Sequence, residues 1–257
     1  MGGEIVLLKN KFKDYSSKDE EDGRYIEDFA KLYSAATKDL DQRLNILLCG
    51  NTLDDLATDD NGFSSSERGN HESKLCDGVV SETEHPICKC MFYYDRNVYP
   101  CSNCKCGIKN PWTNKSEDFE VIDYEYPMPY EHRLSQIGKV DIVLRDKNTD
   151  EVYGVEVKPP RPFGKKPNQN TISTMVAEIL TYTSVLEKGG ELGRKNGKVL
   201  KPAIAFFRDS IQYDKFQEYR NAGDSDFINL FKTIKVFTIE RSIENAKTNF
   251  WFVPIEI

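Results

Sequence analysis

The sequence has no long apolar run. Within its 257 residues, no stretch reaches the roughly 18 consecutive apolar residues that a transmembrane helix needs. The opening segment, MGGEIVLLKNKFKDY, has too short an apolar core for a secretory signal. Gly2 follows Met1, but Val6 stands where N-myristoylation needs serine or threonine. We therefore expect an intracellular protein without a membrane partner.

An excess of positive charge is also missing. The chain has 35 Lys and Arg against 42 Asp and Glu, a net charge of −7. This balance argues against a protein that passively coats nucleic acid. Affinity for a phosphate backbone comes from local cation density, however, and the basic residues do cluster. The segment 158–166 contains no acid and four cations: Lys158, Arg161, Lys165 and Lys166.

Large apolar residues are scarce from Asn51 to Pro86. Such a segment buries too little surface to offset its ordering entropy, so we expect a long mobile insertion. Five of the seven cysteines follow it closely, and in an intracellular protein this density indicates metal rather than disulfides. The spacing suits tetrahedral zinc, although reduced cysteines without metal stay an alternative. The candidate ligands, of which four are needed, are His85, Cys88, Cys90, Cys101, Cys104 and Cys106.

Apolar periodicity predicts the regular elements. A stripe at steps of three or four predicts one amphipathic helix from Arg24 to Cys49, ended by Gly50. The stripe consists of Ile26, Phe29, Tyr33, Ala36, Leu40, Leu44 and Leu47. A second long helix is predicted from Thr171 to Lys188, with shorter ones at 213–220 and 226–232. Strands are predicted at 119–126, 139–145, 152–158, 203–208, 235–239 and 250–257, and residues 4–8 form a short strand or simply pack.

Two of these strands carry the most informative charges. Gly138 to Pro160 (GKVDIVLRDKNTDEVYGVEVKPP) reads as two strands joined by a polar turn. Because alternate side chains of a strand point to opposite faces, Glu156 and Lys158 share one face. Asp141 lies on the first strand, so the two acids and the lysine can converge at one end of the sheet.

Charges on an otherwise apolar face are costly to bury, and a divalent cation explains their presence. Mg²⁺ prefers oxygen ligands and retains waters, so Asp141, Glu156 and the backbone carbonyl of Val157 form a sufficient set. A bound metal lowers the pKa of water and polarises a phosphodiester. Lys158 can orient that water or offset charge in the transition state.

At these positions the sequence resembles the PD-(D/E)xK nuclease superfamily. Asp141 and the Glu156-Val157-Lys158 triplet match its D…ExK signature. Gly138 to Asp141 is closer to the GxxD form of the RecB-like exonuclease branch. That branch also has a QxxxY pair on the next helix, and the matching positions here are Glu178 and Tyr182, with glutamate replacing glutamine.

The resemblance implies an α/β fold with a restriction-endonuclease-like core, in which a central mixed sheet is flanked by helices, and a Mg²⁺- or Mn²⁺-dependent nuclease, for which we favour DNA as substrate. It also implies a further acid upstream, for which Glu27, Glu125 and Glu131 compete. We expect residues 1–50 to form an N-terminal segment and first core helix, 51–117 a mobile insertion with the metal module, and 118–257 the nuclease core. Some exonucleases of this branch carry an iron–sulfur cluster, but their cysteines bracket the core, whereas all of these precede Asp141, so zinc is preferred.

Three functional readings follow. The leading one is a nuclease that cuts DNA, with Arg161, Lys165 and Lys166 holding phosphates beside the scissile bond. A ribonuclease could use the same site. A non-catalytic nucleic-acid-binding or adaptor protein could use the zinc module on a nuclease-like scaffold, since fold alone does not define function.

Overall fold

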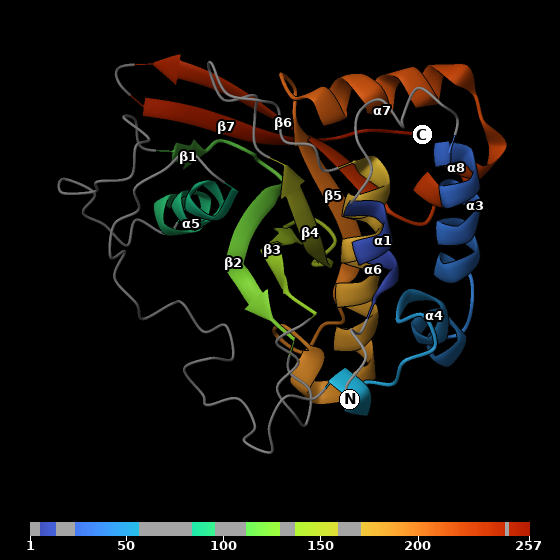
Figure 1. Cartoon of the computed structure of the whole chain (residues 1–257). Coiled ribbons are helices and arrows are strands. Elements are labelled where there is room, and N and C mark those ends of the chain that lie inside the picture. Colours follow the sequence, from blue (N-terminus) through green and yellow to red (C-terminus); the bar gives the residue numbers. More distant parts are fainter. Residues whose placement is uncertain are drawn as a thin grey trace.

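The computed structural model describes residues 6–13, 24–56, 84–95, 112–128, 137–158, 171–244 and 247–257. These residues form a mixed α/β structure in which a seven-stranded sheet is flanked by helices (Figure 1). Among the described helices, none combines the length and apolarity that crossing a bilayer requires.

The sheet contains an antiparallel part and a parallel part, in the order β1-β7-β6-β5-β4-β3-β2. The second, third and fourth strands form an antiparallel meander, and β4, β5 and β6 run parallel to one another. The last strand pairs antiparallel with β6 and parallel with β1. The strands are β1 (Trp112–Asn114), β2 (Phe119–Pro127), β3 (Lys139–Asp146), β4 (Val152–Lys158), β5 (Lys201–Phe207), β6 (Lys235–Glu244) and β7 (Lys247–Pro254).

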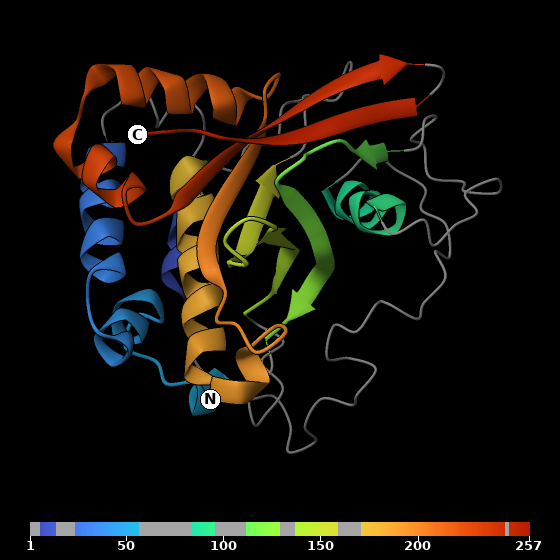
Figure 2. The ribbon, with the colours of Figure 1, turned by 180° about the vertical axis from the view of Figure 1, so that it is seen from behind.

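Most of the helices cover one face of the sheet, with α6 in direct contact with β3, β4 and β5 (Figures 1 and 2). The remaining long helix, α5, covers the opposite face against β2 and β1. The helices are α1 (Leu8–Lys13), α3 (Arg24–Ala36), α4 (Leu40–Leu47), α5 (Glu84–Asp95), α6 (Ile172–Lys188), α7 (Ile211–Ala222) and α8 (Ser225–Phe231), with short 3-10 turns η1 (Asp54–Leu56) and η3 (Gly190–Gly193).

The alternation of side chains along β4 divides the core into two layers. Val155 and Val157 pack on the side of α5, whereas Val152 packs on the side of α6. Glu156 and Lys158 therefore project toward α6, as the alternation predicts. The central helix α6 is buried along almost its whole length, and it begins where Thr171 caps the backbone N–H of Thr174 at 3.1 Å.

The prediction of one helix from Arg24 to Cys49 is wrong. The chain forms α3 and α4 instead, because Asp39 accepts a hydrogen bond from the Gln42 backbone N–H at 3.0 Å and starts a new helix. The predicted stripe is also out of phase at its start. Ile26 is 49% exposed, while Tyr25 and Leu32 are fully buried.

Of the two alternatives predicted for residues 4–8, a short strand or simple packing, the described part fits packing, because Leu7 and Leu8 are buried and α1 begins at Leu8. The Cys-rich run begins on a helix, because residues 84–95 form α5. Both α5 and β1 fall within the predicted insertion, yet α5 packs on β2 and β1 extends the sheet beside β7.

Candidate functional site

Asp141 lies where β3 and β4 stop pairing. The register of the two strands runs from Arg145–Val152 to Ile142–Val155, one residue short of Asp141. The Asp141 carboxylate then accepts the Val157 backbone N–H at 2.7 Å. If the strands continued to pair, a backbone carbonyl of β3 would accept this N–H; here the Asp141 side chain accepts it instead. The carboxylate therefore lies beside the peptide bond that follows Glu156.

Glu156 and Lys158 form a buried ion pair. The ammonium Nζ of Lys158 donates to Glu156 Oε1 at 2.5 Å and lies 3.9 Å from Glu178 Oε2. The three residues are only 3%, 1% and 5% exposed. An ammonium so completely removed from water needs compensating charge, and the two glutamates provide it from β4 and α6.

Tyr182 connects α6 to the start of β3. It follows Glu178 by one helical turn, and its hydroxyl packs on Gly138, where a Cβ atom would lie 2.7 Å from Tyr182 Oη. Gly138 has a φ of +108°, a conformation that side chains rarely adopt. The GxxD glycine is thus required both by its backbone and by the tyrosine above it.

No sequence pattern indicates that Lys9 lies near this cluster. It lies on α1, is 4% exposed, and its ammonium sits 5.5 Å from the centre of the Tyr182 ring. This distance is within the range of a cation–π interaction. The available signal was weak, because Leu8 and Phe12, four residues apart, indicate only a buried helix face and say nothing about the lysine beside it.

Of the three candidates for the further upstream acid, the structure describes Glu27 and Glu125, and the two differ in how they lie relative to Asp141. Glu27 is exposed on α3, and within the described residues no hydrogen bond or ion pair joins it to Asp141 or Glu156. Its neighbour Asp28 is buried instead. Glu131 lies outside the described residues, as do Arg161, Lys165 and Lys166.

Glu125 is better placed, on β2. It lies between the register pairs Tyr124–Ile142 and Tyr126–Val140, which puts it opposite Asp141 on the neighbouring strand. Its φ is +44°, an uncommon value for a residue other than glycine, and its carboxylate lies 3.6 Å from the Lys139 ammonium. Glu125 therefore lies near Asp141 by strand register, and its carboxylate is partly paired with the Lys139 ammonium.

The predicted zinc ligands are only partly described. Cys88 and Cys90 are buried thiols on α5, in the core layer beneath the sheet. Two residues apart on a helix, they point about 200° apart, so they cannot both face one ion. His85 has no described side chain, and Cys101, Cys104 and Cys106 lie outside the described residues. Zinc stays a prediction that metal analysis of the purified protein can test.

A second buried ion pair lies at the edge of the sheet. Lys195 donates to Asp123 Oδ2 at 2.6 Å, and Asp123 is fully buried. Tyr126, which donates to the Arg194 carbonyl, borders this pair. Burial, with a smaller contribution from the charge of Asp123, raises the pKa of Tyr126 to about 12. The ion pair between Lys195 and Asp123 therefore holds the loop after η3 against β2.

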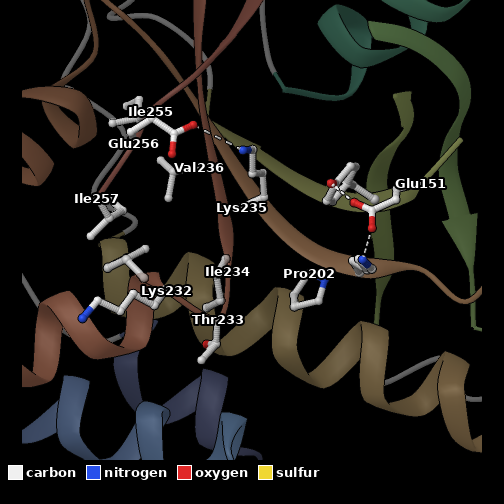
Figure 3. Close-up of a pocket in the computed structure, with 13 residues that line it drawn as sticks. Glu151, Pro202, Lys232, Thr233, Ile234, Lys235, Val236, Ile255, Glu256 and Ile257 are labelled. Carbon is white, nitrogen blue, oxygen red and sulfur yellow. Dashed lines mark hydrogen bonds and ion pairs between the residues drawn. The ribbon is translucent and has the colours of Figure 1, made fainter. Parts of the chain in front are cut away.

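A cavity of about 420 Å³ lies at the other end of β4 and β5 (Figure 3). It borders the starts of these strands, next to Tyr153 and Pro202, whereas Glu156 and Lys158 lie toward the end of β4. Two of the three lysines that line it are paired, Lys235 with Glu256 at 3.7 Å and Lys201 with Glu151, and the third is Lys232. The cavity is therefore separate from the candidate site.

Comparison with known proteins adds no relative to this geometry: no protein-family model, no curated protein and no solved structure matches the chain. The described part of the chain also contains no group of three or more His, Cys, Asp or Glu side chains arranged to hold a metal by themselves. The site must therefore be interpreted from its own residues.

Proposed function

We propose that the protein is a metal-dependent nuclease that hydrolyses phosphodiester bonds, with DNA as the favoured substrate. The observation that carries the proposal is the hydrogen bond from the Val157 N–H to the Asp141 carboxylate, which holds Asp141 against the strand on which Glu156 and Lys158 form their buried ion pair. The order of the elements supports it, since a helix, an antiparallel three-stranded meander, a helix and a parallel strand are the parts expected of a restriction-endonuclease-like core.

The donor set fits Mg²⁺ or Mn²⁺. Asp141 and Glu156 offer carboxylate oxygens from two strands, and the hydrogen bond from the Val157 N–H holds Asp141 next to the Val157 peptide. Mg²⁺ is commonly held by one or two carboxylates, with waters and substrate phosphate completing the shell, so a third protein carboxylate is not required. When bound, the cation would polarise the phosphodiester and lower the pKa of an attacking water.

The other residues have separate roles in this proposal. Lys158 places a positive charge where negative charge develops on the phosphate. Glu178 holds that lysine from the side of α6, and Tyr182 fixes the backbone at Gly138, three residues before Asp141. Arg161, Lys165 and Lys166 follow the catalytic strand and would bind flanking phosphates without reading sequence.

One alternative basic segment is less suited to bind substrate. Between 194 and 201 each cation already has an acidic partner: Arg194 with Glu191, Lys195 with Asp123, Lys198 with Asp150 and Lys201 with Glu151. Binding phosphate there would first break these pairs. The segment 161–166 therefore remains the preferred substrate contact.

A second function is favoured by one observation, the near-complete burial of Glu156 and Lys158. In a non-catalytic nucleic-acid-binding or adaptor protein, their ion pair would be only structural.

A cleavage panel separates the two functions. Linear, circular and single-stranded DNA and RNA are incubated with Mg²⁺, Mn²⁺ or EDTA, and metal-dependent loss of any substrate supports the nuclease. Binding without cleavage under all conditions supports the alternative.

A further inference from the structure

The contact between Lys158 and two glutamates has a consequence for metal binding. In the structure the Lys158 ammonium donates to Glu156, the acid that the proposed function assigns to the metal. A divalent cation that binds this carboxylate would lie close to the ammonium. Two cations cannot share one buried carboxylate without strong repulsion, so the ammonium has to move when Glu156 binds metal.

Glu178 is placed to receive it. Its Oε2 lies 3.9 Å from Lys158 Nζ, beyond the length of a good hydrogen bond but within one small side-chain movement. Glu178 projects from α6, whereas Glu156 projects from β4, so the ammonium lies between two acids on different elements. All three groups are buried, and an ammonium that left Glu156 for no partner would carry a large desolvation cost.

We propose that Glu178 is the positioning residue that takes over the Lys158 ammonium when Glu156 binds a divalent cation. The inference rests on the proposed function, because it assumes a metal site at Asp141 and Glu156. It also gives a reason for glutamate at the position where the resembling QxxxY motif has glutamine. A glutamine would leave the displaced ammonium beside a neutral group, whereas glutamate supplies a full negative charge.

The test uses the full chain and the metal ions alone. Isothermal titration with Mg²⁺ and with Ca²⁺ is carried out on the wild type, Glu178→Gln, Lys158→Met and the double variant, after circular dichroism confirms that each is folded. A hydrogen bond to a charged group has a strength that corresponds to a change in affinity of about 10- to 100-fold. We expect Glu178→Gln to weaken metal binding by about this factor. In the Lys158→Met background, where no ammonium needs a new partner, the same change should alter affinity by less than about twofold.

Two outcomes for Glu178→Gln overturn the inference. Equal weakening by Glu178→Gln in both backgrounds would make Glu178 a direct ligand of the metal. No weakening in either background would make its contact with Lys158 merely structural. If Lys158→Met does not fold, Lys158→Gln replaces it, since the amide can still donate to both acids. If the wild type binds neither ion at millimolar concentration, the metal site is refuted, and the proposed function with it. If the wild type binds metal but Glu178→Gln has no specific effect, only the role of Glu178 is refuted.

Discussion

Replacing Gly138 by alanine should destabilise the protein for two separable reasons. The φ of +108° is unfavourable for an L-residue, which costs about 1–3 kcal/mol. The new Cβ would also lie 2.7 Å from Tyr182 Oη, a contact that forces neighbouring groups apart and adds about 1–3 kcal/mol. We therefore expect Gly138→Ala to lower the free energy of unfolding by about 2–6 kcal/mol.

Two variants separate these contributions. Gly50 also has a positive φ, +83°, but a Cβ added there would meet nothing within 4 Å, so Gly50→Ala should show only the backbone cost. Tyr182→Phe removes the hydroxyl that the Gly138→Ala methyl would meet. The ring carbon Cζ, 3.1 Å from the added Cβ, remains, so in the double variant Gly138→Ala should recover part of the steric cost of about 1–3 kcal/mol.

Urea denaturation followed by circular dichroism measures all of these free energies, provided that the m-value is unchanged among variants. Two results would refute the reasoning. One is that Gly138→Ala is no more destabilising than Gly50→Ala. The other is a coupling between Gly138→Ala and Tyr182→Phe below about 0.5 kcal/mol, the level at which independent sites add.

Glu156→Ala should destabilise the metal-free protein by about 3–5 kcal/mol in urea denaturation, because it leaves the Lys158 ammonium buried with the more distant Glu178; a melting temperature equal to or above that of the wild type would contradict this. The pKa of Tyr126 is raised to about 12 in the folded protein from a value near 10 in the unfolded chain. The contribution of Tyr126 to stability is therefore fully present below pH 10, and roughly 2–3 kcal/mol is lost as the pH rises to 12. Tyr126→Phe should make the fall of stability over this range shallower, and parallel curves for both proteins would show that Tyr126 titrates normally. Replacing Arg161, Lys165 and Lys166 by alanine should weaken DNA binding in Ca²⁺ for every sequence alike and flatten the log–log salt dependence by roughly one unit per lost phosphate contact, whereas an unchanged slope would place the substrate elsewhere.

The sequence predicted the strands around the site well because their signals are local. Alternation along 152–158 places Glu156 and Lys158 together on the α6 side, and the Asp146–Glu151 connector forms the expected turn. The long helix at 171–188 was found to within one residue, since its apolar pattern and the Thr171 cap agree. The helices after β5 and the strands β6 and β7 were also found. Helix α7 and strand β6 are longer than predicted, whereas α8 is displaced by one residue and β7 by three residues toward the N-terminus.

What the sequence could not predict depends on contacts between distant residues. Apolar spacing continues smoothly through Asp39, so only the capping hydrogen bond reveals the break between α3 and α4. Two acids near each other, Asp141 and Glu156, suggest that removing Glu156 would relieve repulsion and stabilise the fold. The ion pair between Glu156 and Lys158 reverses this expectation. The packing of Lys9 on Tyr182 joins α1 to α6, elements far apart in the chain, which no local pattern indicates.

Mg²⁺-dependent cleavage by the wild type and by Asp141→Asn, prepared in the same way, tests most directly whether the protein is a metal-dependent nuclease. Asp141→Asn keeps the size of the side chain and its amide oxygen can still accept the Val157 N–H, so the fold should be retained. Glu117→Gln, which changes an exposed acid, serves as the control. We expect the wild type and the control to cleave linear DNA with Mg²⁺ and not with EDTA, and Asp141→Asn not to cleave. Equal cleavage by all three proteins, or no cleavage by the wild type on any nucleic acid, would contradict this expectation.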